Sequence, residues 1–123
     1  MKAASSSEIK EALRQQAHGR LVDICLRLAR FKKENKELLT YILFEADDEA
    51  AYVSSVKKEM DAGFAALNKS SVYLAKKTIR KVLRTANRFT RYAGSATVEA
   101  ELLLHFCYLL KHSGVQLRKS TAL

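Results

Sequence analysis

Apolar residues recur every three or four positions along most of the chain, which is the period of α-helices with one buried side. The longest apolar stretch, 102–110, has almost no polar side and is interrupted only by a histidine. This pattern predicts that the last helix is the central one of the fold. The predicted helical segments are approximately 5–18, 21–31, 38–46, 49–67, 71–92 and 96–112. At the polar junction 32–36, the helix either continues or bends.

Residues typical of helix ends separate these segments. Ser5 and Glu8 have the spacing of a capping box, in which each side chain accepts a hydrogen bond from a free backbone N–H. Gly94 is typical of a helix C-terminus, because glycine adopts a left-handed backbone conformation without strain. The other predicted boundaries are a break at Gly19, an N-cap at Asp47 or Asp48, and N-caps at Ser71 and Ser95.

The composition favours an all-α fold. The 123 residues include no proline and only four glycines, whereas β-rich folds usually need both at their turns. Short links between helices predict antiparallel hairpins. Because no repeat of 34 to 47 residues is evident, we expect an irregular bundle of about six helices, with HEAT-like stacking as the alternative. The length predicts one domain, 1–123, with a frayed end over 114–123.

Three residues inside apolar patterns carry further expectations. Gly63 lies within a predicted helix, where glycine costs about 1 kcal/mol relative to alanine, so close helix packing is expected there. Cys25 and Cys107 are predicted to be buried and free. No stretch approaches the roughly 20 apolar residues of a membrane span, and the N-terminus lacks the hydrophobic segment of a secretory signal. These features predict a cytoplasmic protein without a membrane partner.

The net charge of +9 comes largely from one segment, 68–92, which contains eight basic residues and no acidic one. On a helical wheel of 100° per residue these cations fall within an arc of about 140°. Tyr73 lies within the same arc. The predicted contact residues for a polyanion, nucleic acid above all, are Lys76, Lys77, Arg80, Lys81, Arg84, Arg88, Arg91 and Tyr73. Lys69 joins them only if the helix extends back that far.

Two other interpretations of the basic stripe remain open. It is either a solvated surface without a partner, or it is neutralised by carboxylates. Those carboxylates could belong to another protein or a second copy of the chain, which would make the protein an interaction scaffold or a homo-oligomer. They could also be the chain's own neighbouring acids: Glu45, Asp47, Asp48, Glu49, Glu59 and Asp61.

No motif indicates catalysis, so the sequence predicts a binding protein without enzymatic activity. No metal is expected, because the histidines lack the spacing of a ligand set. No cofactor is expected either, because there is no glycine-rich phosphate loop or nucleotide fingerprint. His105 is predicted to be a hydrogen-bonded residue of the core or of an interface. Paired carboxylates such as Glu45 with Glu49 are routine on helix surfaces.

Two stretches, LVDICLRLARFKKENKELLTYILFE and YLAKKTIRKVLRTANRFTRY, resemble segments of small uncharacterised bacterial all-helical proteins. Together they cover less than half of the chain. This resemblance implies an all-helical fold and carries no known activity. The opening EIKEALRQQAHGRLVDICLRLA also resembles SAP domains, small helix–link–helix modules that bind DNA.

Overall fold

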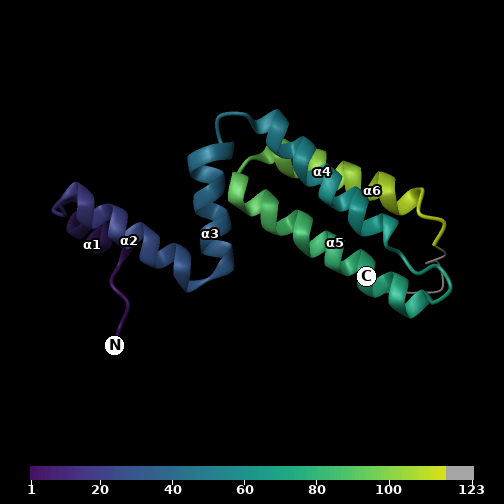
Figure 1. The fold of residues 1–123 in the computed structure, drawn as a ribbon, viewed down its shortest axis with the longest axis horizontal. Helices are drawn as coiled ribbons and strands as arrows, with labels where there is room; N and C mark the ends of the chain where they lie inside the picture. The colour runs from purple at the N-terminus through teal and green to yellow at the C-terminus, as the bar shows by residue number, and fades with distance from the viewer. Residues whose placement is uncertain (116–123) are drawn as a thin grey trace. The chain divides into compact units, whose positions relative to one another are not determined.

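The computed structural model describes residues 1–115 and contains only helices and connecting turns in that range (Figure 1). The all-α prediction is therefore confirmed. The elements are α1 (Ser6–Arg14), α2 (His18–Phe31), α3 (Lys33–Thr40), the π-helical turn η1 (Tyr41–Glu45), α4 (Glu49–Ala65), α5 (Val72–Ala93) and α6 (Ala96–Lys111).

Contacts within the chain divide it into two compact units, 1–40 and 41–123. The single-domain interpretation and the HEAT-like alternative stay predictions. Most of the predicted frayed end, 114–123, lies outside the described residues.

The first unit begins with the predicted capping box. Ser5 Oγ accepts a hydrogen bond from the Glu8 N–H, and the Ser5 N–H donates to Glu8 Oε1 at 3.2 Å. This backbone bond to the ionised carboxylate lowers the pKa of Glu8, and the Ser5 hydroxyl adds to the effect. The cap sets the start of α1 at the predicted position.

The predicted break at Gly19 is wrong. The chain leaves α1 at Gln15, whose N–H bonds back to carbonyls of the last turn, and becomes extended at Ala17, the N-cap of α2. Gly19 lies in the first turn of α2, with nothing within 4 Å of where a Cβ would stand. The first turn tolerates glycine because its backbone N–H groups have no partner within the helix in any case.

The first unit buries none of its side chains, although α2 and α3 pack against each other. Extended backbone at Lys32 separates these two helices, and Asn35 Nδ2 donates to the Leu28 carbonyl at 2.8 Å. Phe31 remains 77% exposed. The apolar stripe expected along α2 thus exists, but it is not covered within its own unit.

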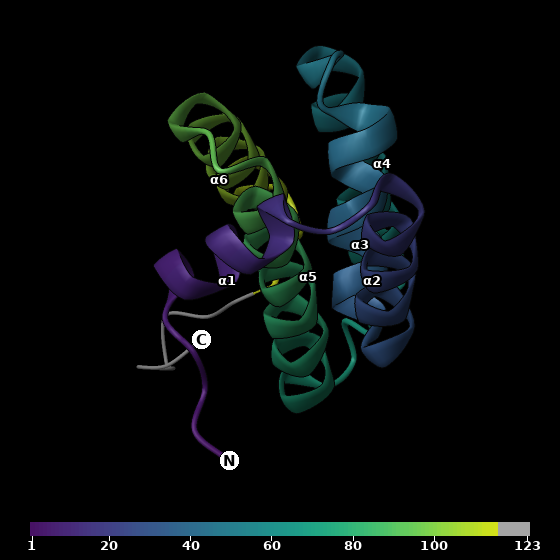
Figure 2. The same cartoon turned by 90° about the vertical axis from the view of Figure 1, so that its left-hand side faces the viewer.

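The described part of the second unit is a three-helix bundle in which α4, α5 and α6 each pack against the other two (Figures 1 and 2). The helices alternate in direction, as the short links predicted. Tyr52 Oη donates to the Phe89 carbonyl at 2.7 Å and so fixes α4 against α5. Buried residues from all three helices form the core: Tyr52, Val53, Val56, Met60, Phe64, Ala75, Ile79, Val82, Ala86, Val98, Leu102 and Phe106.

Close packing at Gly63 is confirmed. A Cβ at this position would lie 2.5 Å from Val82 Cγ2 of α5. Real Cβ atoms do not approach a neighbour so closely, so the glycine lets α4 and α5 come together here. The local cost in helix propensity is offset by interhelical packing.

Two predictions about burial are wrong. The last helix is not central, because α6 buries Val98, Leu102 and Phe106 on one side and leaves Leu104 70% exposed on another. Each helix of a three-helix bundle has two neighbours, so its outer side faces solvent whatever its composition. For a related reason Cys25 and Cys107, both predicted to be buried, are exposed; they are free cysteines, as expected.

The turn η1 joins the third helix to the bundle in the sequence. The Ala46 N–H donates to the Tyr41 carbonyl at 2.9 Å, five residues back, which is the π-helical spacing. Tyr41 is buried, with its ring centroid 4.6 Å from that of Tyr52. The three residues that follow it, 42–44, are apolar and exposed.

Candidate polyanion-binding face

Helix α5 has the length and the ends that its sequence predicts. Ser71 Oγ accepts a hydrogen bond from the Leu74 N–H, and Gly94 ends the helix with a left-handed φ of 59°. Four small or aliphatic residues on one side are buried in the bundle: Ala75, Ile79, Val82 and Ala86. They lie opposite the predicted basic arc, so the amphipathic pattern of this helix is confirmed.

The basic residues lie on the side of α5 that faces away from the core. We define the basic face as Lys76, Lys77, Arg80, Lys81, Arg84, Arg88 and Arg91. Lys76 and Arg88 are partly buried, and the other five are exposed. From Lys76 to Arg91 the face runs for about 22 Å at a rise of 1.5 Å per residue.

Lys69 lies outside the basic face, and Arg88 lies against an aromatic ring. Lys69 precedes α5, in the turn before Ser71, and its Nζ lies beside Gly114, so the face does not extend back to it. The Arg88 guanidinium carbon lies 5.2 Å from the centre of the Phe89 ring, within the range of a cation–π contact. The exposed cations are therefore concentrated between Lys77 and Arg91.

The chain's own acids do not neutralise most of this face. Throughout 1–115, no carboxylate lies within 4.0 Å of the charged group of Lys76, Lys77, Lys81, Arg84 or Arg91. Glu59 and Lys81 line a common groove of about 260 Å³, without an ion pair between them. For these five cations the predicted internal pairing is absent.

Several of those acids have other partners instead. Asp48 caps α4 by accepting a hydrogen bond from the Ala51 N–H at 3.0 Å. Asp61 Oδ1 lies 2.7 Å from His105 Nε2. His105 is therefore hydrogen-bonded, as the sequence predicts, and its contact with Asp61 links α4 to α6.

Crowding of like charge carries an energetic cost. The basic face contains seven pairs of cations spaced three or four residues apart. Each such pair destabilises a helix by about 0.2–0.5 kcal/mol, so their combined repulsion is about 1–3 kcal/mol at low salt. An anion bound across the face would relieve this repulsion.

Tyr73 stands on the same side of α5, one turn before Lys76 and Lys77, and is 73% exposed. Its neighbours Val72 and Leu74 are also exposed. The sequence predicts Tyr73 on the basic arc, but it does not predict that Val72 and Leu74 are exposed.

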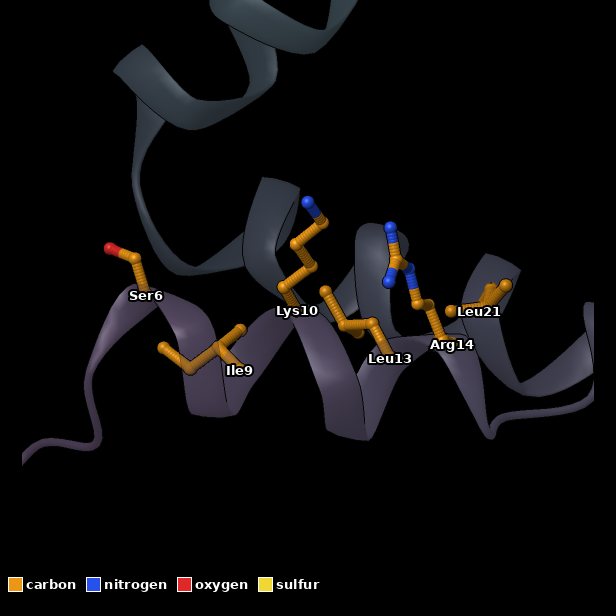
Figure 3. Close-up of a pocket in the computed structure, with 6 residues that line it drawn as sticks. All are labelled: Ser6, Ile9, Lys10, Leu13, Arg14 and Leu21. Atoms are coloured by element: carbon orange, nitrogen blue, oxygen red, sulfur yellow. The ribbon is translucent and has the colours of Figure 1, made fainter.

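The first unit has a concave surface of its own. A hollow of about 510 Å³ is lined by Ser6, Ile9, Lys10, Leu13, Arg14 and Leu21. Figure 3 shows Lys10 and Arg14 extending to the same side of α1. Arg14 also forms an ion pair with Glu11 at 3.7 Å. The lining of the hollow combines three aliphatic side chains with two basic ones.

Within 1–115, no three side chains of the metal-ligating types histidine, cysteine, aspartate and glutamate gather. Nor does any helix of 1–115 have the length and apolar character needed to cross a membrane.

Comparison of the chain with protein-family models, curated proteins and solved structures finds no match.

Proposed function

We propose that this protein is a non-catalytic binding module that holds a nucleic acid by its phosphates along the basic face of α5. The observation that carries the proposal is the accumulation of cations on one side of a helix whose segment, 68–92, has no acidic residue. Five of them lack a carboxylate partner in the described chain. Solvated helix surfaces normally mix both signs, which avoids the repulsion estimated above.

Phosphates fit this face better than a compact anion does. The cations are spread over about 22 Å of helix, so one small ligand contacts only a few of them. A nucleic-acid strand presents a row of phosphates and can contact many at once, releasing condensed counterions as it binds. Contacts of this kind position the nucleic acid and carry little sequence information.

The salt dependence of binding tests the proposal. We expect the full chain to bind fluorescent oligonucleotides of mixed sequence in an anisotropy titration at about 50 mM salt. If five cations contact a single strand, the affinity should fall about 100-fold between about 50 and 200 mM salt. No binding at low salt, or equal affinity at both salt concentrations, would show that the basic face does not hold nucleic acid.

A protein-interaction scaffold is the second candidate, and exposed apolar side chains favour it. Leu28, Phe31 and Phe44 are each more than half exposed, and Leu104 and Tyr108 are exposed on α6. Burial of such groups is the main driving force of protein association. Light scattering of the nucleic-acid-free protein separates the two functions, because a homo-oligomer has a multiple of the 13.9 kDa chain mass.

A further inference from the structure

Tyr73 differs from the other tyrosines of the chain. Of the five tyrosines, Tyr41, Tyr52, Tyr92 and Tyr108 each pack against another aromatic ring. Tyr73 forms no hydrogen bond and no ring contact within 1–115. Its ring therefore contributes nothing visible to the stability of the described bundle.

The position of Tyr73 places this free ring among the cations. Lys76, Lys77 and Arg80 follow it by three, four and seven residues, which are the spacings that share one side of a helix. Exposed Val72 and Leu74 flank it and make its surroundings partly apolar. A phosphate backbone alone would need only the cations and gain nothing from this apolar end.

We propose that the face binds single-stranded nucleic acid, with an unpaired base stacked on Tyr73 while the adjacent phosphates lie along Lys76 and Lys77. This inference rests on the proposed function and adds the class of nucleic acid to it. Bases in a duplex are stacked on one another and their flat sides are not accessible, whereas those of a single strand are. Stacking tolerates any base, because every base has a flat π-surface.

Tyr73→Ala and Tyr73→Phe, compared in anisotropy titrations, test the stacking. A stacked base is worth about 1–3 kcal/mol, so Tyr73→Ala should weaken binding to single-stranded DNA and RNA about tenfold. Tyr73→Phe should bind nearly as the natural chain does, since it retains the ring. Binding to a duplex of equal length should change less than twofold in either variant. Tyr108→Ala, another exposed tyrosine but on α6, is the matched control and should bind normally.

A fluorescence experiment gives a second measurement that does not depend on removing the ring. The chain contains no tryptophan, so Tyr73→Trp introduces a single reporter. Single-stranded oligo-dT and oligo-U should quench its emission on binding, and the duplex should quench it much less.

The outcomes separate the two proposals. The stacking proposal is wrong if Tyr73→Ala binds single strand and duplex with the affinities of the natural chain. It is also wrong if the variant loses affinity for both forms by the same factor. If the natural chain still shows salt-dependent binding in either case, the proposed polyanion-binding function holds without base stacking. If the natural chain binds neither form at low salt, the proposed function itself fails.

Discussion

Replacing Lys77, Lys81 and Arg84 together with alanine should weaken binding to single-stranded DNA on the order of 100-fold at about 50 mM salt. The three side chains are exposed and have no carboxylate partner in the described chain. Each lost phosphate contact should also lower the salt dependence, so the slope of log K against log salt should fall by about 2. Anisotropy titrations over a range of salt measure both quantities.

The same variant should be as stable as the natural chain or more so. It removes five of the seven like-charge pairs of the basic face, which relieves repulsion of about 1–2 kcal/mol at low salt. Thermal unfolding followed by circular dichroism measures this change. Stability and binding are then expected to move in opposite directions, which excludes unfolding as the cause of lost affinity.

A variant with an equal change in charge is the control. Replacing Lys32, Lys33 and Lys36 with alanine removes three exposed cations around α3, outside the bundle unit. This control variant should bind single-stranded DNA with an affinity close to that of the natural chain. If both triple variants lose affinity equally, binding depends on net charge and the basic face has no special role.

Leu102→Ala should destabilise the protein by about 3 kcal/mol. Leu102 is 0% exposed in the core between α6 and its neighbours. Leucine-to-alanine changes at such sites cost about 2–5 kcal/mol, because buried methyl groups are lost and a cavity remains. Chemical denaturation, with the midpoint and slope fitted separately, measures the change.

Leu104→Ala is the matched control, since it is the same substitution two residues further along α6. Leu104 is 70% exposed, so its replacement should change the free energy of unfolding by less than about 0.5 kcal/mol. A large loss at Leu104 would mean that this side of α6 is covered, as the sequence had predicted for a central helix. Similar losses at both positions would contradict the arrangement of the bundle.

The sequence predicted best those features that depend on local chemistry. Hydroxyl and carboxylate caps at Ser5, Asp48, Ser71 and Ser95 act within one turn of helix, and all four lie where the pattern placed them. The two sides of α5 were also predictable, because an all-basic arc and an aliphatic arc differ strongly in hydration. The close approach at Gly63 followed from the cost of an interior glycine.

Features that depend on the neighbours of a helix were not predictable. The apolar run of α6 gives no information on how many helices pack around it, so Leu104 and Cys107 appeared buried. The apolar side of α2, which its own unit leaves uncovered, was not predictable for the same reason. The partners of the acids were beyond the sequence too, because the contact between Asp61 and His105 joins residues 44 positions apart.

The polyanion-binding face is tested most directly by recording the amide signals of isotope-labelled protein while single-stranded DNA is added at low salt. The signals that shift should come mainly from α5 between Tyr73 and Arg91, and those of α2 and α3 should stay in place. Raising the salt should reverse the shifts. Shifts confined to the first unit, or none at all on α5, would contradict the proposed function.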